Sequence, residues 1–237
     1  MGEDEEVSPG GFFAMRTGPV PGDGHRPLAR LYAGDDAPLA ARIDTVARRL
    51  GTSERRVAAS VAHLGLAARL WSVALGPAAV TGGFPALRAE SLYWDPCAAT
   101  PDDLWPAAAG IVPGCAARIR EIVQYGHLEP LAAAVRRDTP VPVRLLWGNA
   151  GSALAGAVRQ LIAWARAHGR ADVAARTRAL AAELFGHPDL RDTGAPHGQG
   201  FRRNTCCLYY RLPGGGLCGD CVFDEAPRRL PGRSDGG

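Results

Sequence analysis

The sequence predicts a mainly α-helical protein: a single helical domain that carries a small cysteine-rich loop or hairpin near its C-terminus. Three observations support this fold class. Long stretches of the chain repeat apolar residues every three or four positions, which is the period of an amphipathic helix. Segments with strand character are short, so any sheet is expected to be small. Four of the six cysteines gather within residues 201–224.

The chain begins with a segment that shows no helical period and is rich in proline and glycine. We therefore predict an irregular N-terminal segment over residues 1–35, with residues 1–10 disordered. A helical domain is expected over residues 36–237. Asp36 stands at the expected N-cap of its first helix, and Gly51 is expected to end that helix.

The next stretch predicts a long amphipathic helix capped by Thr52 or Ser53. Its apolar residues recur in steps of three and four, namely Val57, Val61, Leu64, Ala68, Trp71 and Leu75. Gly76 and Pro77 are expected to end it. Within this helix we interpret His63 as half-buried and Trp71 as a core residue, not as parts of a ligand pocket.

Residues 77–113 interrupt the helical pattern with several prolines and paired glycines. Only residues 91–96, with the sequence SLYWDP, have strand-like aromatic content. Cys97 lies in this region, and Cys115 starts the helix that follows. A helix N-terminus lowers a thiol pKa, but the sequence places no histidine beside either cysteine, so we interpret both as structural thiols.

Two further helices are expected before the cysteine-rich segment. The first, over residues 143–168, carries a strip of small residues that another element could approach closely: Gly148, Ser152 and Gly156. The second covers residues 171–185 and is closed by Gly186 and Pro188.

The cysteine-rich segment has the layout of a metal site. Cys206 and Cys207 are adjacent, ten residues separate Cys207 from Cys218, and two separate Cys218 from Cys221. Two intervening residues let one turn aim both sulfurs of the second pair at a common centre. The glycine-rich sequence at residues 212–216 is expected to reverse the chain, so that the first pair can meet the second.

The backbone around the cysteines limits which metal centre fits. Gly219 is expected to permit a tight path between Cys218 and Cys221. In a regular strand Cys206 and Cys207 would point to opposite faces, so both can bind metal only where the backbone is irregular or the centre is wide. This geometry favours a two-iron cluster over a single ion.

Other interpretations of the cysteines stay open. Soft thiolates also bind zinc, and zinc ribbons use four cysteines in two pairs, so a structural zinc site is the strongest alternative. Disulfides are a weaker one, because the acidic start of the chain does not resemble a secretory signal. A histidine ligand from His187 or His197, as in Rieske centres, is not needed, because four cysteines already complete the site.

Charge and hydropathy disfavour two classes of partner. All 27 basic residues are arginine, and 24 acidic residues are interleaved with them to give a net charge of +3. No basic stripe of the kind that follows nucleic-acid phosphates is evident, so we expect no nucleic-acid partner. Charges interrupt every long apolar run, so we expect no transmembrane segment. We expect a cytoplasmic protein and leave open peripheral contact with the inner face of the cell membrane.

The cysteine pattern resembles the C-terminal signature of ferric-siderophore reductases of the FhuF type, which carry a [2Fe-2S] cluster. Residues 60–85 and 143–157 are similar to two other recurrent blocks of that family. The resemblance implies that the cluster ligands are Cys206, Cys207, Cys218 and Cys221. It also implies that the protein reduces a ferric siderophore by one electron and releases iron(II). The electron donor would be reduced ferredoxin, flavodoxin or a flavin reductase.

Five further residues are weaker candidates for substrate binding. Arg69 resembles an arginine of the first family block and is expected to contact substrate or to form a buried ion pair. Asn149 lies in the second block, where its amide could hydrogen-bond a cluster sulfur, a loop carbonyl or a siderophore oxygen. Arg202, Arg203 and Arg211 flank the first cysteine pair. We expect these arginines to favour the reduced cluster, an effect that Asp220, Asp224 and Glu225 on the other flank oppose. We also expect them to rim a cleft that attracts an anionic ligand or a redox partner.

Two other functions fit the same sequence. The protein could be a ferredoxin-like electron carrier or an iron–sulfur sensor, although a carrier needs little more than the cluster loop. It could also be a zinc-stabilised binding module or a relative that serves siderophore biosynthesis. The colour of the purified protein, and its reoxidation by a ferric hydroxamate after reduction, separate these functions from a reductase.

Overall fold

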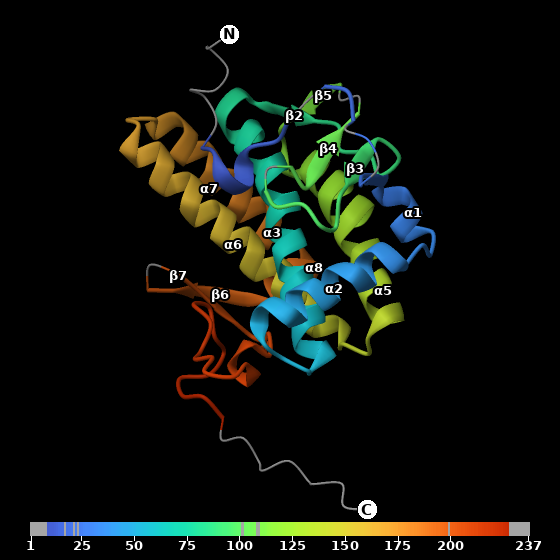
Figure 1. The fold of residues 1–237 in the computed structure, drawn as a ribbon. Coiled ribbons are helices and arrows are strands. Elements are labelled where there is room, and N and C mark those ends of the chain that lie inside the picture. The colour runs from blue at the N-terminus through green and yellow to red at the C-terminus, as the bar shows by residue number, and fades with distance from the viewer. Residues whose placement is uncertain are drawn as a thin grey trace, which may run out of the picture.

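The computed structural model describes residues 9–227, apart from residues 17, 21, 23, 101, 108, 109 and 199. Within this part of the chain the fold is mainly α-helical, as the sequence predicts. The longer helices form a bundle, and the cysteine-rich segment lies at one end of it (Figure 1). Most of the tip predicted to be disordered, residues 1–10, lies outside the described residues.

The helices follow the chain in a simple order. The α-helices are α1 (Leu28–Tyr32), α2 (Ala37–Leu50), α3 (Arg55–Thr81), α4 (Ala116–Ile119), α5 (Glu129–Asp138), α6 (Val143–Ala167), α7 (Ala171–Phe185) and α8 (Pro188–Arg191). A π-helical segment, η3 (Arg120–Leu128), joins α4 to α5, and short 3₁₀ turns form η2 (Gly11–Phe13) and η4 (Tyr209–Arg211). The helix predicted over residues 171–185 is confirmed at both ends by α7.

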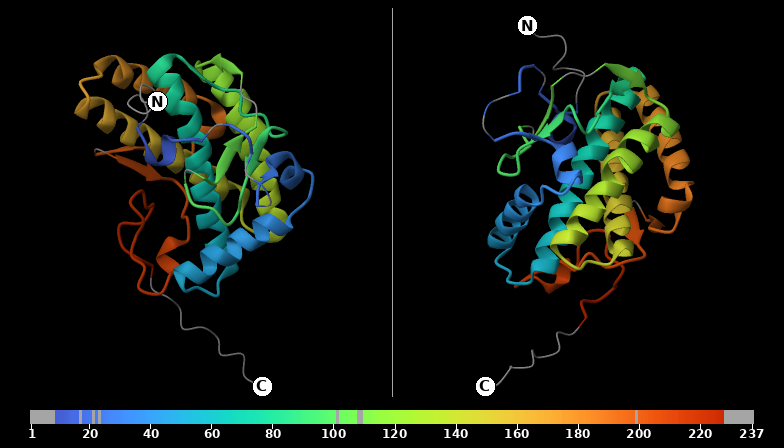
Figure 2. Two further views of the ribbon diagram at one scale, coloured as in Figure 1. Left: turned by 45° about the horizontal axis from the view of Figure 1, so that its top comes forward. Right: turned by 90° about the vertical axis from the view of Figure 1, so that its right-hand side faces the viewer.

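Helix α3 runs through the middle of the bundle and is enclosed by its neighbours (Figure 2). Most of its residues are buried, because the helix is apolar on nearly all sides and not only along one stripe. Trp71 is fully buried, as predicted, and its indole Nε1 donates a hydrogen bond to the carbonyl of Ala150 in α6 at 3.0 Å. This contact fixes α3 against α6, the two helices that carry the cysteine-rich segment.

Both ends of α3 differ from the prediction. The N-cap residue is Glu54, and Thr52 instead accepts a hydrogen bond from the Glu54 amide at 3.1 Å. The helix continues through Pro77 and ends at Gly82, whose φ of 86° is left-handed. Burial of the last turn explains this continuation, since Arg176 of α7 donates a hydrogen bond to the Ala79 carbonyl at 2.7 Å.

The helix predicted to start after Asp36 and to end at Gly51 is confirmed as α2, but its N-cap differs from the prediction. Helix α2 ends at Gly51, which adopts the left-handed conformation with φ of 60°. Asp36 occupies the N-cap position but does not cap the helix with its side chain. Its carboxylate forms an ion pair with Arg137 of α5 at 2.7 Å instead.

Helix α3 is long and apolar enough to cross a membrane by length and composition. However, 78% of its most apolar window is buried inside the protein. A mostly buried helix of this kind is typical of a protein core, and the other described helices do not meet the same criteria.

The sheets are small, as predicted. Strands β1 (Arg26–Pro27), β3 (Leu92–Trp94) and β4 (Leu104–Pro106) form one antiparallel sheet in the order β1-β3-β4. Strand β2 (Gly83–Pro85) pairs with β5 (Ile111–Pro113), and β6 (Gly194–His197) forms a hairpin with β7 (Gly200–Arg203). The hairpin β6-β7 leads directly into the cysteines.

Two predictions about the N-terminal half are wrong. Residues 28–32 form helix α1 where irregular structure was expected, because Leu28 and Leu31 are buried in the core. Cys97 and Cys115 are both exposed, although unpaired cysteines are usually buried. Short runs without a period, and single thiols, are positioned by tertiary contacts that the local sequence does not show.

Helix α6 carries small residues where the cysteine-rich segment approaches it. A Cβ at Gly148 would overlap the hydroxyl of Thr205, and a Cβ at Gly151 would overlap that of Thr193. A Cβ at Gly156 would meet no such neighbour, since the nearest atom is the end of the Arg159 side chain at 4.0 Å. The predicted close approach is therefore confirmed at Gly148, and the approaching element is the chain between β7 and the first cysteine pair.

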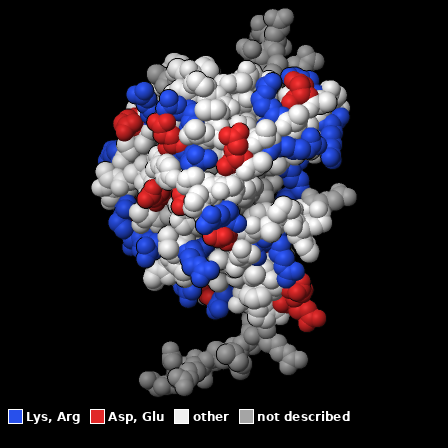
Figure 3. Space-filling view, turned by 180° about the vertical axis from the view of Figure 1, so that it is seen from behind, with Lys and Arg blue, Asp and Glu red and all other residues white. Residues whose placement is uncertain are grey.

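Charged residues are mixed over the surface. Figure 3 shows acidic residues interspersed among arginines over the rear face of the molecule. This distribution agrees with the interleaved charges in the sequence.

Candidate metal centre

The first cysteine pair lies in irregular backbone immediately after β7, as a metal site there requires. Cys206 and Cys207 belong to no strand or helix, and Leu208 has a φ of 69°. A left-handed conformation is uncommon for leucine and turns the chain sharply. This turn brings the Leu208 amide to the Cys206 sulfur, to which it donates a hydrogen bond at 3.2 Å.

The chain reversal brings the second pair back to the first. Residues 212–216 form a turn in which Gly214 has a φ of 66°. The sulfurs of Cys207 and Cys218 then lie 3.4 Å apart. The Cys221 amide donates to the Cys218 carbonyl at 3.1 Å, which closes the turn between the second pair. Gly219 has no positive φ and open space beside it, so the expected conformational need for glycine there is wrong.

The four thiols influence one another electrostatically. The Cys218 thiol, a hydrogen-bond partner, lowers the pKa of Cys207 to about 6, and the Tyr209 amide and the Arg203 charge lower it further. Burial raises the pKa of Cys206, and the charges of Cys207 and Cys221 add to this rise. Cys218 also has a raised pKa, first because of its hydrogen bond with Cys207 and also through the charge of Cys221. Each thiol is therefore close enough to affect two others.

A buried arginine beneath the first cysteine pair is the main electrostatic feature of the site. Only 1% of Arg203 is exposed, and its Nη2 donates to Asn149 at 2.6 Å. Its Nε and Nη1 are buried and have no hydrogen-bond partner among the described residues. A buried charge without compensation costs several kcal/mol. Four thiolates that bind a metal centre beside Arg203 would supply the missing negative charge.

Asn149 and Ser60 connect this arginine to the cysteine backbone. Asn149 is fully buried, and its amide donates to the Ser60 carbonyl of α3 at 2.9 Å. The Ser60 hydroxyl in turn donates to the Cys207 carbonyl at 2.8 Å. The network therefore joins α3, α6 and the cysteine loop. Of the three partners expected for the Asn149 amide, a carbonyl is correct, but it belongs to a helix and not to a loop.

His63, one turn after Ser60, is a second buried group that the sequence interpretation underestimated. It is 1% exposed, not half-buried, and neither ring nitrogen has a hydrogen-bond partner among the described residues. Burial lowers its pKa to about 3, and the nearby charge of Arg203 lowers it as well. The apolar periodicity placed His63 on the long helix, but only the fold shows that Arg203 lies near it.

The other two candidate arginines form ion pairs, and Arg202 also donates a hydrogen bond to the carbonyl of Val222, next to Cys221. Arg202 forms an ion pair with Asp224 at 2.9 Å, and Arg211 forms one with Glu54 of the α2-α3 connection at 2.6 Å. Both side chains are partly exposed, whereas Arg203 is enclosed. The prediction that all three rim an open cleft is therefore wrong for Arg203, because alternate residues of β7 point inward and it is one of them.

Arg69 lies away from the cysteines in a buried ion pair, one of its two expected roles. Its Nε donates to Asp103 at 2.9 Å, and only 1% of Arg69 is exposed. The two histidines considered as ligands also lie elsewhere. His187 begins α8 and bonds the Asp189 amide, and His197 is exposed on β6.

The donor set suits a wide sulfur-bound centre. Among the described residues, no three His, Cys, Asp or Glu side chains are grouped as ligands of one metal ion. The sulfurs of Cys207 and Cys218, which come from opposite segments of the loop, are in contact. Thiolates from two segments could hold a [2Fe-2S] cluster, and the charge of Arg203, whose Nε and Nη1 have no partner among the described residues, would then act on it through Cys206 and Cys207.

Four thiols gathered at one end of a helical domain suit a thiolate-ligated metal centre. Residues 203–223 match the family model described as the FhuF 2Fe-2S C-terminal domain. The cysteine-rich segment is therefore of the FhuF type, and its cofactor is a [2Fe-2S] cluster. No curated protein and no solved structure matches the chain significantly.

Proposed function

We propose that this iron–sulfur protein transfers one electron to a ferric siderophore, reduces iron(III) to iron(II) and thereby releases the iron. The observation that carries the proposal is the match of residues 203–223 to the FhuF 2Fe-2S domain. The partial exposure of Cys206, Cys218 and Cys221 supports it, because a redox centre at the surface can exchange electrons with another molecule.

The chemistry of the substrate explains why one electron is enough. Iron(III) is a hard, highly charged ion that the oxygen donors of a siderophore hold tightly, whereas iron(II) carries less charge and is held more weakly. The electron enters from a reduced ferredoxin, a flavodoxin or a flavin reductase and ends on the substrate iron. The siderophore keeps its donor atoms, so no protein acid or base is required.

The residues of the chain set the conditions for this transfer. A [2Fe-2S] cluster supplies electrons one at a time. Cys206, Cys207, Cys218 and Cys221 would hold it, and the Leu208 amide donates a hydrogen bond to one of these sulfurs. Arg203 places a buried positive charge beside the first pair, which favours the more negative, reduced state. We place this activity in the cytoplasm, where the released iron is used.

A reoxidation experiment tests the proposal. Anaerobically purified protein is reduced with dithionite, freed of excess reductant and mixed with ferric siderophores of several chemical classes. Return of the oxidised visible spectrum, together with one iron(II) captured by a chelator per electron, is expected for at least one class. Reduced protein that no ferric siderophore reoxidises would contradict the proposal.

The same experiment separates the second candidate function. An electron carrier would also be coloured when purified and would bleach on reduction. However, only a protein partner, and no ferric siderophore, would reoxidise it. The partial exposure of Cys218 and Cys221 is compatible with such a partner. The size of the helical domain favours a substrate site of its own.

A further inference from the structure

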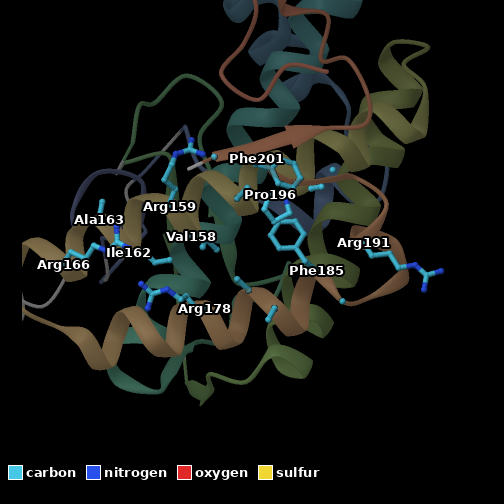
Figure 4. Close-up of a pocket in the computed structure, with 17 residues that line it drawn as sticks. Val158, Arg159, Ile162, Ala163, Arg166, Arg178, Phe185, Arg191, Pro196 and Phe201 are labelled. Atoms are coloured by element: carbon cyan, nitrogen blue, oxygen red, sulfur yellow. The ribbon is translucent and has the colours of Figure 1, made fainter. Parts of the chain in front are cut away.

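A groove lies between α6, α7 and the hairpin β6-β7 (Figure 4). Its volume is about 1110 Å³, enough for a small-molecule ligand. Val158, Ile162 and Pro196 line it, and so do the aromatic rings of Phe185 and Phe201, whose centroids are 5.5 Å apart. The groove therefore offers an apolar and partly aromatic surface.

Four arginines line the groove, and no acidic residue does. Arg166 of α6 and Arg178 of α7 lie at one end in Figure 4, whereas Arg191 points away at the other. Arg166 and Arg178 are exposed and form no ion pair with the described residues. Arg191 is only loosely paired with Asp192, at 3.7 Å. Arg166 and Arg178, two positive charges without an ion-pair partner among the described residues, lie beside an apolar surface and favour an anionic ligand.

The fourth arginine connects the groove to the cysteine loop. Arg159 lines the groove and lies 3.7 Å from the carboxylate of Asp220, which is between Cys218 and Cys221 in the chain. Asp220 also accepts a hydrogen bond from Ser152 of α6 at 2.5 Å. Phe201 adds a second connection, because it lines the groove from β7, the strand that leads into the first cysteine pair. A ligand in the groove would therefore lie beside the segment that holds the cluster.

We propose that this groove is the substrate site, and that it takes a negatively charged ferric chelate with aromatic rings, as in siderophores of the catecholate type. This inference rests on the proposed reductase function. The aryl rings would pack on Phe185 and Phe201, and the negative charge of the chelate would face Arg166 and Arg178. Neutral or cationic hydroxamate chelates offer neither aryl rings for the two phenylalanines nor negative charge for the two arginines.

Binding is measured separately from electron transfer with gallium(III) chelates, which have the same charge and shape but are not reduced. Calorimetry is performed on the cluster-containing protein with a gallium catecholate, a gallium citrate and a cationic gallium hydroxamate. The catecholate is expected to bind most tightly, and its affinity is expected to fall as salt is added. Tighter binding of the hydroxamate than of the catecholate would overturn the assignment. So would binding of flavin mononucleotide to a protein that does not bind the catecholate.

Variants locate the site. Arg166→Gln and Arg178→Gln are each expected to weaken catecholate binding by about tenfold, as for the loss of one charge-assisted contact. Arg136→Gln removes an exposed arginine from α5, outside the groove, and should leave the affinity unchanged. Visible spectra and circular dichroism check that all variants keep the cluster and the fold. Unchanged affinity in both groove variants would refute the proposal.

The outcomes for the groove and for the reductase function are distinguishable. If the gallium catecholate binds and depends on Arg166 and Arg178, but its ferric form is never reduced, the groove stands and the reductase function fails. If the groove variants reduce ferric catecholate as fast as the unaltered protein, the reductase function stands and the groove proposal fails.

Discussion

Replacing Arg203 with glutamine should lower the reduction potential of the cluster. Arg203 is 1% exposed and influences both Cys206 and Cys207 electrostatically. The cluster becomes more negative on reduction, so a nearby positive charge stabilises the reduced state more than the oxidised state. Removing that charge therefore makes the cluster harder to reduce.

The magnitude follows from the burial of the side chain. Two unit charges about 7 Å apart interact by about 2.4 kcal/mol at an effective dielectric constant of about 20. For a one-electron couple, about 1.4 kcal/mol corresponds to about 59 mV, so the potential should fall by up to about 100 mV. Salt should screen this effect only weakly, because the guanidinium is enclosed.

The assay is an anaerobic redox titration followed by visible absorption or electron paramagnetic resonance. Arg203→Lys keeps the charge and should recover most of the potential. Arg211→Gln is the matched control, because Arg211 is partly exposed and paired with Glu54 at 2.6 Å, and should cause a much smaller shift. Iron content and the visible spectrum must match the unaltered protein. A potential that is unchanged or higher in Arg203→Gln would refute the reasoning.

Two further predictions concern packing and pH. Gly148→Ala should reduce cluster retention, because the new Cβ overlaps Thr205. Gly156→Ala should retain the cluster and stabilise α6 by up to about 1 kcal/mol. Iron content after gel filtration measures retention and urea denaturation measures stability; equal iron content in the two variants would contradict the prediction. The free energy of unfolding should fall as the pH drops below 6.5, because burial lowers the pKa of His127 in the folded protein, so that the unfolded chain binds the extra proton. His127→Gln should make the fall in the free energy of unfolding between pH 7 and about pH 5.5 smaller, because the variant lacks this depressed group. An identical pH dependence in urea denaturation of the variant would exclude this role for His127.

The gathering of the cysteines at one end of the fold could be predicted from the sequence because its determinants are local. Irregular backbone at the first pair follows from two adjacent ligands, and the reversal follows from a glycine-rich turn. The contact between Cys207 and Cys218 agrees with both expectations. The signals that define the ends of α7 are equally local, since they are the apolar periodicity and the glycine and proline that follow.

The environment of the site was not predictable in the same way. Whether Arg203 points inward or outward depends on which face of β7 packs against α6, and flanking residues do not fix this. The continuation of α3 past Pro77 depends on Arg176, about a hundred residues later in the chain. The groove likewise combines side chains from two helices and a hairpin, so no single stretch of sequence contains its pattern of charge.

The central claim is that four cysteines near the C-terminus hold two irons that accept one electron. The most direct test is the visible absorption spectrum of anaerobically purified protein before and after dithionite, combined with iron and sulfide analysis. We expect a red-brown protein that bleaches on reduction and contains two irons and two sulfides per chain, the composition of a [2Fe-2S] cluster. Colourless protein that holds a single zinc ion would contradict the account.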